Sequence, residues 1–312
     1  MPTQVKDVKQ LIKESLKADF KEFLDLTGHI AGLLSSETDR FDDMKITGRL
    51  IQARPQFEAI VVGDLHGDLE TLALILETSE FLQKAQQDQR LILFFLGDYG
   101  DRGILSPEVY YVVLKLKASF PNHVVLMRGN HEGPDDLMAS PHDLPTYLRA
   151  RFGTHWSEIY MGLKRFYDQL YTSVIIEDSC VLLHGGVPSR AKSLDDLAYA
   201  HTKHPRESHL EEILWSDPEE SIKGTCPSPR GAGRLFGQDV TEKFLGMLKV
   251  NILIRGHEPA ELGYKINHAG KVLTLFSRKG EPYFNSRGAF LQFNMTERIR
   301  DAFQLERFVR QL

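Results

Sequence analysis

Five short polar segments of this 312-residue chain place histidine, aspartate or asparagine just after a run of apolar residues. These residues are Asp64 and His66, Asp98 and Asp101, Asn130 and His131, His184, and His257. Each segment alone has an ordinary explanation, because Gly-Asp and His-Gly-Gly are common turn sequences and a lone histidine is more often a satisfied polar residue than a ligand. Five endings of the same kind, all in residue types that bind metal ions, are difficult to explain by turn chemistry.

The chemistry that suits this set is a two-metal centre. Three histidines, two carboxylates and an amide oxygen can fill two coordination spheres if one carboxylate bridges ions that lie ~3.5–4 Å apart. Imidazole and oxygen ligands without thiolate favour manganese, iron or zinc. Such ions lower the pKa of a bound water, which supplies hydroxide at neutral pH, and they bind phosphate oxygens. The set therefore predicts phosphoester hydrolysis.

The elements that must position these residues alternate between strands and helices. Helical periodicity covers residues 69–83 and 107–117, between apolar runs that predict strands. Strands are expected at residues 58–62, 91–96, 123–127, 172–176, 180–183 and 251–254. Strand–helix–strand order is typical of an α/β fold with a parallel sheet and right-handed crossovers. Ligands bind at the carboxyl ends of such strands, which is where all five polar segments fall.

The remaining segments predict the organisation of the chain. Residues 5–34 carry amphipathic periodicity, so we expect residues 1–50 to form an N-terminal helical segment. We expect it to cover the core of a single domain over residues 1–312, with a docking role as the alternative. Residues 221–237 are rich in Gly, Pro and Ser, which favours a long loop.

Composition narrows the choice of partners and compartment. The net charge of -5 gives no electrostatic reason to expect nucleic acid or an anionic membrane as partner. Two cysteines, Cys180 and Cys226, cannot form a disulfide framework and fit a reducing compartment. No apolar run reaches membrane-spanning length. A cytoplasmic protein that does not bind membranes is expected.

Three motifs carry a family resemblance. Gly-Asp-Leu-His-Gly at 63–67, Gly-Asp-Tyr-Gly-Asp-Arg-Gly at 97–103 and Arg-Gly-Asn-His-Glu at 128–132 resemble the signature motifs of the PPP-type serine/threonine protein phosphatases, which are calcineurin-like metallophosphoesterases. His-Gly-Gly at 184–186, Leu-Trp-Ser-Asp-Pro at 214–218 and Arg-Gly-His-Glu at 255–258 resemble further blocks in the family's order. The resemblance implies an αββα sandwich of two mixed sheets flanked by helices, with a dinuclear metal site at strand carboxyl ends.

The resemblance also implies a role for each matching residue. One metal ion would be held by Asp64, His66 and Asp98, and the other by Asp98, Asn130, His184 and His257, with Asp98 as the bridge. His131 would be the general acid that protonates the leaving oxygen, and Asp101 would orient it and keep it charged. Arg102 would clamp the phosphate in a bidentate manner. Asn130 would also touch a phosphate oxygen.

Two family positions are less well defined in this chain. A second phosphate-binding arginine is expected after residues 215–218, and Arg230 is the candidate. Arg234 lies close by in the sequence. The alternative is that Arg230 is an ordinary solvated charge on a loop. The family's block after the last core strand departs at residues 277–283. Either Tyr283 replaces the tyrosine that the family places beside its metals, or that tyrosine is absent.

The expected activity is hydrolysis of phosphoserine and phosphothreonine monoesters in a phosphoprotein or phosphopeptide, by in-line attack of a metal-bound hydroxide. Manganese is the favoured metal, with iron or zinc as alternatives, and no regulatory subunit is specified. One rival is a small-molecule phosphoesterase, such as a dinucleoside polyphosphate hydrolase. The other is a non-catalytic scaffold, which the complete ligand set opposes. The departures from the eukaryotic pattern favour a prokaryotic or archaeal type, or else a divergent eukaryotic one.

Overall fold

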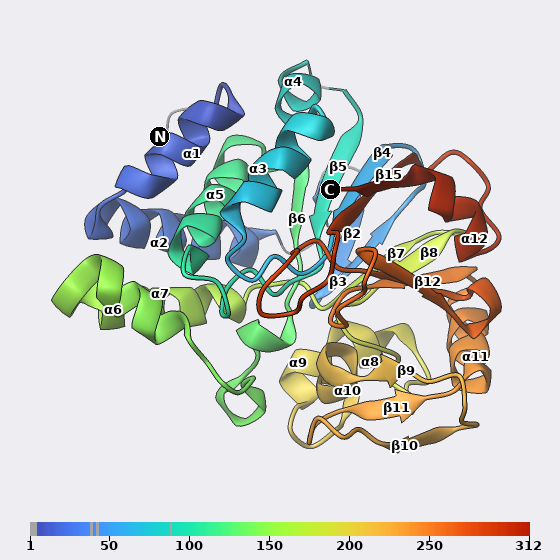
Figure 1. Ribbon diagram of the computed structural model, residues 1–312. Helices are drawn as coiled ribbons and strands as arrows, with labels where there is room; N and C mark the ends of the chain where they lie inside the picture. The colour runs from blue at the N-terminus through green and yellow to red at the C-terminus, as the bar shows by residue number, and fades with distance from the viewer. Residues whose placement is uncertain (1–4, 38–39, 42–43, 88) are drawn as a thin grey trace.

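The computed structural model describes residues 5–37, 40–41, 44–87 and 89–312. Two sheets lie face to face at its centre, with helices on both outer sides (Figure 1). The first sheet has five strands among these residues, in the spatial order β16 (Val309–Gln311), β15 (Ala289–Asn294), β4 (Glu58–Val62), β5 (Leu91–Phe95) and β6 (Val124–Leu126). Strands β4, β5 and β6 are parallel, with Val62 opposite Phe95 and Phe95 opposite Leu126. Their carboxyl ends are therefore level with one another.

The second sheet has eight strands among the described residues and is mixed. Their spatial order is β1 (Arg40–Phe41), β2 (Met44–Thr47), β3 (Leu50–Ala53), β7 (Ser173–Ile176), β8 (Cys180–Leu182), β12 (Ile252–Arg255), β14 (Val272–Leu275) and β13 (Tyr264–Asn267). Leu182 packs into the core between the sheets, whereas Val181 and Leu183 pack on the outer face. Burial on both faces explains why β8 is an apolar run without polar alternation.

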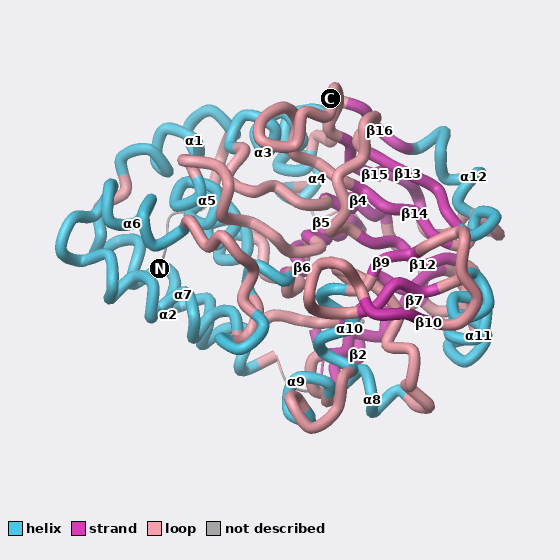
Figure 2. The backbone as a smooth tube through the Cα atoms, turned by 60° about the horizontal axis from the view of Figure 1, so that its bottom comes forward, coloured by secondary structure: helices cyan, strands magenta, loops and turns pink. Residues whose placement is uncertain are grey.

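Helices cover the outer faces of both sheets. Beside the first sheet lie α1 (Val8–Lys17), α2 (Phe20–Ser36), α3 (Leu69–Thr78), α4 (Phe81–Gln86), α5 (Ser106–Ser119), α6 (Leu144–Phe152) and α7 (Trp156–Tyr167). Beside the second lie α8 (Leu194–Ala198), α9 (Ala200–Lys203), α10 (His209–Trp215) and α11 (Gln238–Leu248), and α12 (Ala302–Leu305) lies near the carboxyl end. Figure 2 shows the strands at the centre and the helices around them. None of the helices in the described part of the chain has both the length and the apolar character needed to cross a bilayer.

The expected strands and most expected helices are confirmed, apart from shifts of one or two residues at their ends. The single helix expected at residues 69–83 is instead α3 and α4, because Glu80 adopts a left-handed conformation with φ 57° that interrupts the helix. Pro107 does lie in the first turn of α5. Short 3₁₀ helices occur at Asn130–Glu132, Asp135–Leu137, Gly153–His155, His268–Gly270 and Glu306–Phe308.

The helical segment expected over residues 1–50 is too long. Asp7 and Asp19 cap α1 and α2 by accepting hydrogen bonds from backbone amides, and the helical part ends at Ser36. Strands β2 and β3 follow, because Met44 and Ile46 are buried on either side of an exposed Lys45, which is a period-two pattern. Residues 1–4, 38–39 and 42–43 lie outside the described residues. The single-domain organisation stays a prediction.

The long loop expected at residues 221–237 is also wrong in part. It contains β10 (Thr225–Pro227) and β11 (Arg234–Phe236), which form a small sheet with β9 (Asp217–Pro218). Strand β11 pairs in parallel with β9 and antiparallel with β10. Pro227 is tolerated because β10 is an edge strand. The Gly and Pro content of this stretch concealed its three-residue strands.

Candidate metal centre and active site

The five polar segments converge where the two sheets meet. Strands β4, β5 and β6 of the first sheet each end a few residues before one segment, and β8 and β12 of the second sheet end before the other two. Hydrogen bonds join the two sets: the His257 amide donates to Asp64 Oδ1 over 2.9 Å, and His184 Nδ1 lies 3.0 Å from the carbonyl oxygen of Leu96. The site therefore forms across the interface between the sheets.

Asp98 lies between two groups of potential ligands. Its Oδ2 is 3.5 Å from His66 Nε2, whereas its Oδ1 is 3.5 Å from His184 Nε2. Asp64 Oδ2 lies on the His66 side, 3.7 Å from the same His66 nitrogen. Asn130 Oδ1 lies on the other side, 2.9 Å from His184 Nε2 and 3.0 Å from His257 Nδ1. This is the arrangement expected of a carboxylate that bridges two ions.

The protonation preferences of these residues fit divalent metal ions. Burial raises the pKa of Asp64 to about 7, and burial together with the charge of Asp64 raises that of Asp98 well above its usual range. Burial lowers the pKa of His66, His184 and His257 well below normal, which keeps the imidazoles in the neutral form that ligates metals. Asp64 Oδ2 and His257 Nε2 are buried without a hydrogen-bond partner among the described residues. Cations would satisfy both atoms and offset the buried carboxylate charge.

The backbone around the site is locally strained. Positive φ angles occur at His66 (43°), Asp98 (55°), Asp101 (63°), Arg102 (67°) and His257 (73°), although none of these residues is glycine. Such conformations cost about 1–3 kcal/mol each and persist where the surrounding structure enforces them. They turn each side chain toward the site immediately after its strand.

Glycines let the strand ends approach one another. Gly97 has a φ of 110°, and a Cβ on it would lie 2.2 Å from the backbone nitrogen of Gly129. A Cβ on Gly129 would lie 2.1 Å from Asp98 Oδ1. Both positions therefore need glycine, because a side chain at Gly97 would clash with the backbone of Gly129 and a side chain at Gly129 would displace the Asp98 carboxylate.

Glu132 was not assigned a role from the sequence, although it belongs to the third motif. Its buried carboxylate accepts hydrogen bonds from the backbone amides of Asp98 (2.8 Å), Tyr99 (3.0 Å) and Gly129 (3.1 Å). It also accepts one from the hydroxyl of Tyr110 (2.7 Å). Glu132 thus fixes the loop after β5 relative to the loop after β6, and the only sequence signal was its place in the motif.

His131 forms a hydrogen-bonded pair with Asp101, as expected of a general acid and the residue that orients it. His131 Nδ1 lies 2.6 Å from Asp101 Oδ2, and a second histidine, His142, places its Nδ1 2.8 Å from the same oxygen. Burial alone would raise the pKa of Asp101, but hydrogen bonds from both histidines hold this pKa below its usual range. A nitrogen of His131 also lies within 4.8 Å of ligand atoms of His66 and Asp98. Sequence reasoning missed His142.

The two predicted arginines reach the same cavity. Arg102 Nη1 donates to the carbonyl oxygen of Pro141 over 2.9 Å, and Arg230 Nε donates to Asp217 Oδ2 over 2.7 Å. Both side chains line the cavity, whereas Arg234 is not among its lining residues and donates to Thr225. The geometry therefore favours Arg230 over Arg234.

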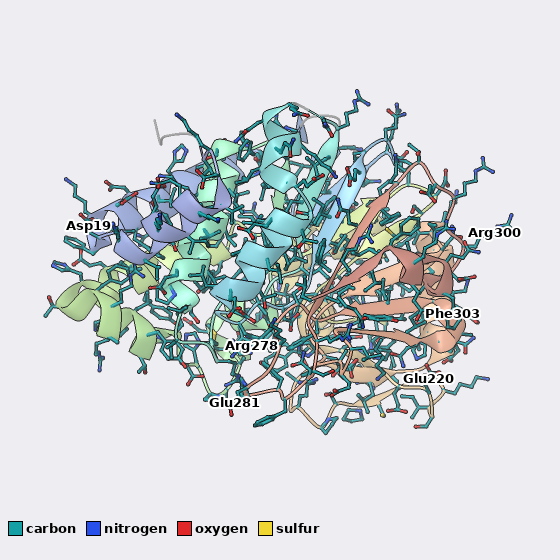
Figure 3. All side chains as sticks on the ribbon, turned by 45° about the horizontal axis from the view of Figure 1, so that its top comes forward. Asp19, Glu220, Arg278, Glu281, Arg300 and Phe303 are labelled. Atoms are coloured by element: carbon teal, nitrogen blue, oxygen red, sulfur yellow. The ribbon has the colours of Figure 1, made fainter. Side chains whose placement is uncertain are left out.

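Tyr283 lies beside the predicted ligands. Its ring centroid is 5.3 Å from that of His66, and burial raises the pKa of its hydroxyl. The loop that carries it is held down by Arg278, which donates to the carbonyl oxygens of His66 and Glu281. Arg278 and Glu281 lie close together in Figure 3. Tyr283 thus has the position that the first of the two alternatives requires, beside a predicted metal ligand, and its replacement of the family's tyrosine stays a prediction.

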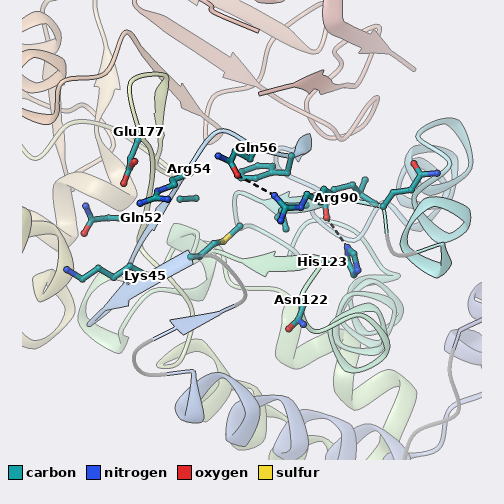
Figure 4. Close-up of a pocket in the computed structure, with 14 residues that line it drawn as sticks. Lys45, Gln52, Arg54, Gln56, Arg90, Asn122, His123 and Glu177 are labelled. Carbon is teal, nitrogen blue, oxygen red and sulfur yellow. Dashed lines mark hydrogen bonds between the residues drawn. The ribbon is translucent and has the colours of Figure 1, made fainter. Parts of the chain in front are cut away.

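One cavity of about 600 Å³ brings these groups together. Its walls include His66, Asp98, Arg102, Asn130, His131, Arg230, His257 and Tyr283. A different pocket of about 630 Å³ lies near the amino ends of β5 and β6, where Arg90 donates to Gln56 and His123 contacts the carbonyl oxygen of Leu91 (Figure 4). That pocket contains none of the predicted site residues.

The comparison with known families agrees with the fold and with this set of potential metal ligands. The family model for calcineurin-like phosphoesterases matches residues 58–261. The chain belongs to the calcineurin-like phosphoesterase family.

Individual relatives are named as serine/threonine protein phosphatases. A probable enzyme of this kind from Encephalitozoon cuniculi is 34% identical over 76% of this chain and 50% of its own length. The serine/threonine-protein phosphatase 4 catalytic subunit of Candida glabrata is 31% identical over 72% of this chain and 70% of its own length. The chain thus spans only about half of the first of these relatives. Both organisms are eukaryotes, which gives no support to the expected prokaryotic or archaeal type.

Solved structures show the same fold. A serine/threonine phosphatase from Saccharomyces cerevisiae, described as similar to human phosphatase PP5, superimposes with a TM-score of 0.71. That alignment covers 89% of this chain and 83% of the solved chain at 24% sequence identity. The predicted αββα sandwich of two mixed sheets is confirmed.

Proposed function

We propose that this protein is a metal-dependent serine/threonine protein phosphatase that hydrolyses phosphoserine and phosphothreonine monoesters. The observation that carries the proposal is the position of Asp98, whose two carboxylate oxygens face two separate groups of ligands. The His131–Asp101 pair beside it adds a proton donor. The relatives named as serine/threonine protein phosphatases support a protein substrate.

The residues that would hold two divalent ions are those predicted from the sequence: Asp64, His66 and Asp98 for one, and Asp98, Asn130, His184 and His257 for the other. When bound, such ions stabilise the charge of the phosphoryl oxygens and activate water as a nucleophile. Manganese suits the nitrogen and oxygen donors best, with iron or zinc as alternatives. The two cysteines also fit a cytoplasmic location.

His131 is the group that would protonate the leaving serine or threonine oxygen. Asp101 contacts its Nδ1, so the proton to be transferred is held at Nε2. Asp101 remains a carboxylate, because it accepts hydrogen bonds from His131, His142 and the backbone amides of Asp143 and Leu144. A fixed carboxylate keeps the imidazole oriented toward the cavity.

Arg102 and Arg230 would bind the phosphoryl oxygens from two sides of the cavity. Asp217 fixes Arg230 through its Nε, which leaves the two terminal nitrogens for the substrate. Asp217 also accepts a hydrogen bond from buried Arg255 over 2.8 Å. This pair of contacts orders the arginine before a substrate arrives, and such preorganisation reduces the entropic cost of binding.

Parallel assays test the proposal. The purified protein with manganese is given a phosphoserine peptide in one reaction and a dinucleoside tetraphosphate in another. We expect release of phosphate from the peptide and little cleavage of the nucleotide. Cleavage of the nucleotide alone would establish the small-molecule alternative instead.

A variant tests the role of His131. His131→Asn should remove most peptide hydrolysis while metal content, measured by atomic emission, stays at the wild-type value. Loss of bound metal in this variant would show that His131 is a ligand, an assignment that its proximity to His66 and Asp98 also permits.

A further inference from the structure

A second groove lies beside the active-site cavity, on the outer side of the second sheet. It has a volume of about 990 Å³ and is bounded by the segment after β8, the segment between α9 and α10, and helix α11. Its apolar surface comes from Val187 and Phe244, which are buried, and from Val240 and Met247, which are partly exposed. A methionine and a phenylalanine side by side can accommodate a large apolar side chain of a ligand.

Four basic side chains surround this apolar surface. Arg190 and Lys192 follow β8, Arg206 precedes α10, and Lys243 lies on α11. All four are exposed. None of them makes a side-chain hydrogen bond or ion pair with another residue in the described part of the chain. They stand out because the chain as a whole carries a net charge of -5.

Each acidic residue of the groove already contacts a hydrogen-bond donor within the protein. Asp196 accepts a hydrogen bond from Lys203 Nζ over 2.7 Å, and Glu207 lies 3.2 Å from His209 Nε2. Glu211 accepts a hydrogen bond from the backbone amide of Gly233 over 2.8 Å. Glu211 keeps its negative charge, because a backbone amide does not neutralise it, yet the four cations of the groove outnumber its three carboxylates and its net charge is positive.

The groove adjoins the active-site cavity. Glu211 lines both, and its hydrogen bond to Gly233 holds the segment that carries Arg230. A polypeptide whose phosphorylated residue occupies the cavity can thus continue past Glu211 into the groove.

We infer that this groove binds an acidic segment of the phosphoprotein substrate, one that carries a large apolar side chain next to several aspartates or glutamates. The acidic residues would pair with Arg190, Lys192, Arg206 and Lys243, and the apolar side chain would lie on Phe244 and Met247. This inference rests on the proposed phosphatase function and adds a sequence preference to it.

The binding test uses a fluorescent, unphosphorylated peptide with five glutamates and one phenylalanine, observed by anisotropy. The variant is Lys192→Gln, Arg206→Gln and Lys243→Gln combined. We expect about tenfold weaker binding, because each exposed ion pair changes affinity by a factor of roughly 1.5 to 5. Replacing the peptide's phenylalanine by glycine should also weaken binding.

A matched variant controls for overall charge. Lys9→Gln, Lys13→Gln and Lys21→Gln remove three exposed charges from α1 and α2, far along the chain from the groove. We expect this control to bind the peptide as the wild type does. Equal binding by the wild type and the groove variant would overturn the inference. Tighter binding of a single-stranded oligonucleotide of equal charge would also overturn it, because an apolar contact with a peptide would then play no part.

A kinetic test separates the groove from the phosphatase function. Two phosphoserine peptides are compared, one with the acidic extension and one without. In the wild type the extension should lower KM about tenfold, the groove variant should lose this advantage, and hydrolysis of p-nitrophenyl phosphate should stay the same in both. If the acidic extension binds to the groove without lowering KM, the groove does not bind substrate and the inference is overturned. If neither phosphopeptide is hydrolysed, it is the proposed function that fails.

Discussion

His142 Nδ1 lies 2.8 Å from Asp101 Oδ2, in a partly buried contact with the carboxylate that also orients the proposed general acid. The other nitrogen of His142 lies 2.9 Å from the hydroxyl of Tyr160. The chain Tyr160–His142–Asp101 therefore links helix α7 to the active site. His142 contacts the same oxygen of Asp101 as His131 does, which makes His142 a positioning residue.

The first prediction concerns this contact. His142→Ala should lower kcat on a phosphoserine peptide about tenfold, because Asp101 would then orient His131 less well. It should lower kcat on p-nitrophenyl phosphate much less, because nitrophenolate leaves without a proton. Steady-state kinetics on both substrates measure the difference. Equal losses on the two would show that His142 acts only on the stability of the site.

The second prediction separates Asp98 from Asp101. Asp98→Asn should reduce bound metal well below two ions per chain, because both ligand groups share this carboxylate. Asp101→Asn should keep the metal content and slow kcat about 100-fold, the range lost with general acid catalysis. Metal analysis of dialysed protein and peptide kinetics give the two readouts. A fall in metal content in Asp101→Asn would contradict the proposed division of roles.

The third prediction concerns Glu132, whose carboxylate joins two loops. Glu132→Gln should destabilise the protein by about 3 kcal/mol, because an amide NH₂ group would face backbone N–H donors in a buried site. Urea unfolding measures this change. Glu242→Gln, on the exposed side of α11, is the control and should change stability by less than about 0.5 kcal/mol. If both variants have the same free energy of unfolding, the hydrogen bonds of Glu132 make no net contribution to stability.

The fourth prediction is a pH dependence at Lys117. Burial lowers the pKa of this lysine to about 8, even though Glu37, 2.8 Å away, opposes the shift. The unfolded chain keeps the ordinary value near 10.4, so above pH 8 the unfolded state binds more protons and the free energy of unfolding rises with pH. From pH 7 to pH 10.5 the wild type should gain about 3 kcal/mol relative to Lys117→Met. If the free energies of unfolding of the two proteins change with pH in the same way, the pKa of Lys117 is not lowered.

The sequence was sufficient to predict the five strand ends, because each combines a buried apolar run with a motif placed directly after it. Alignment of parallel strands accounts for the meeting of the residues after β4, β5 and β6, whereas the docking of a second sheet, which carries His184 and His257, was not predicted from periodicity. His142 could not be predicted, because its partner Asp101 lies 41 residues away in the chain and no motif contains it. The strand pair β10 and β11 could not be predicted either, because three-residue strands in a Gly-rich stretch show no periodicity.

The division of the proposed ligands between two sheets has a consequence for the order of assembly. Asp64 and His257 are 193 residues apart in the chain, yet a hydrogen bond joins them. Closing so long a segment costs conformational entropy, and only the contacts between the docked sheets can offset that cost. The proposed metal site should therefore form only after nearly the whole chain has folded. Metal affinity should consequently report on docking of the two sheets, and substitutions in the core between them should weaken it even when they touch no ligand.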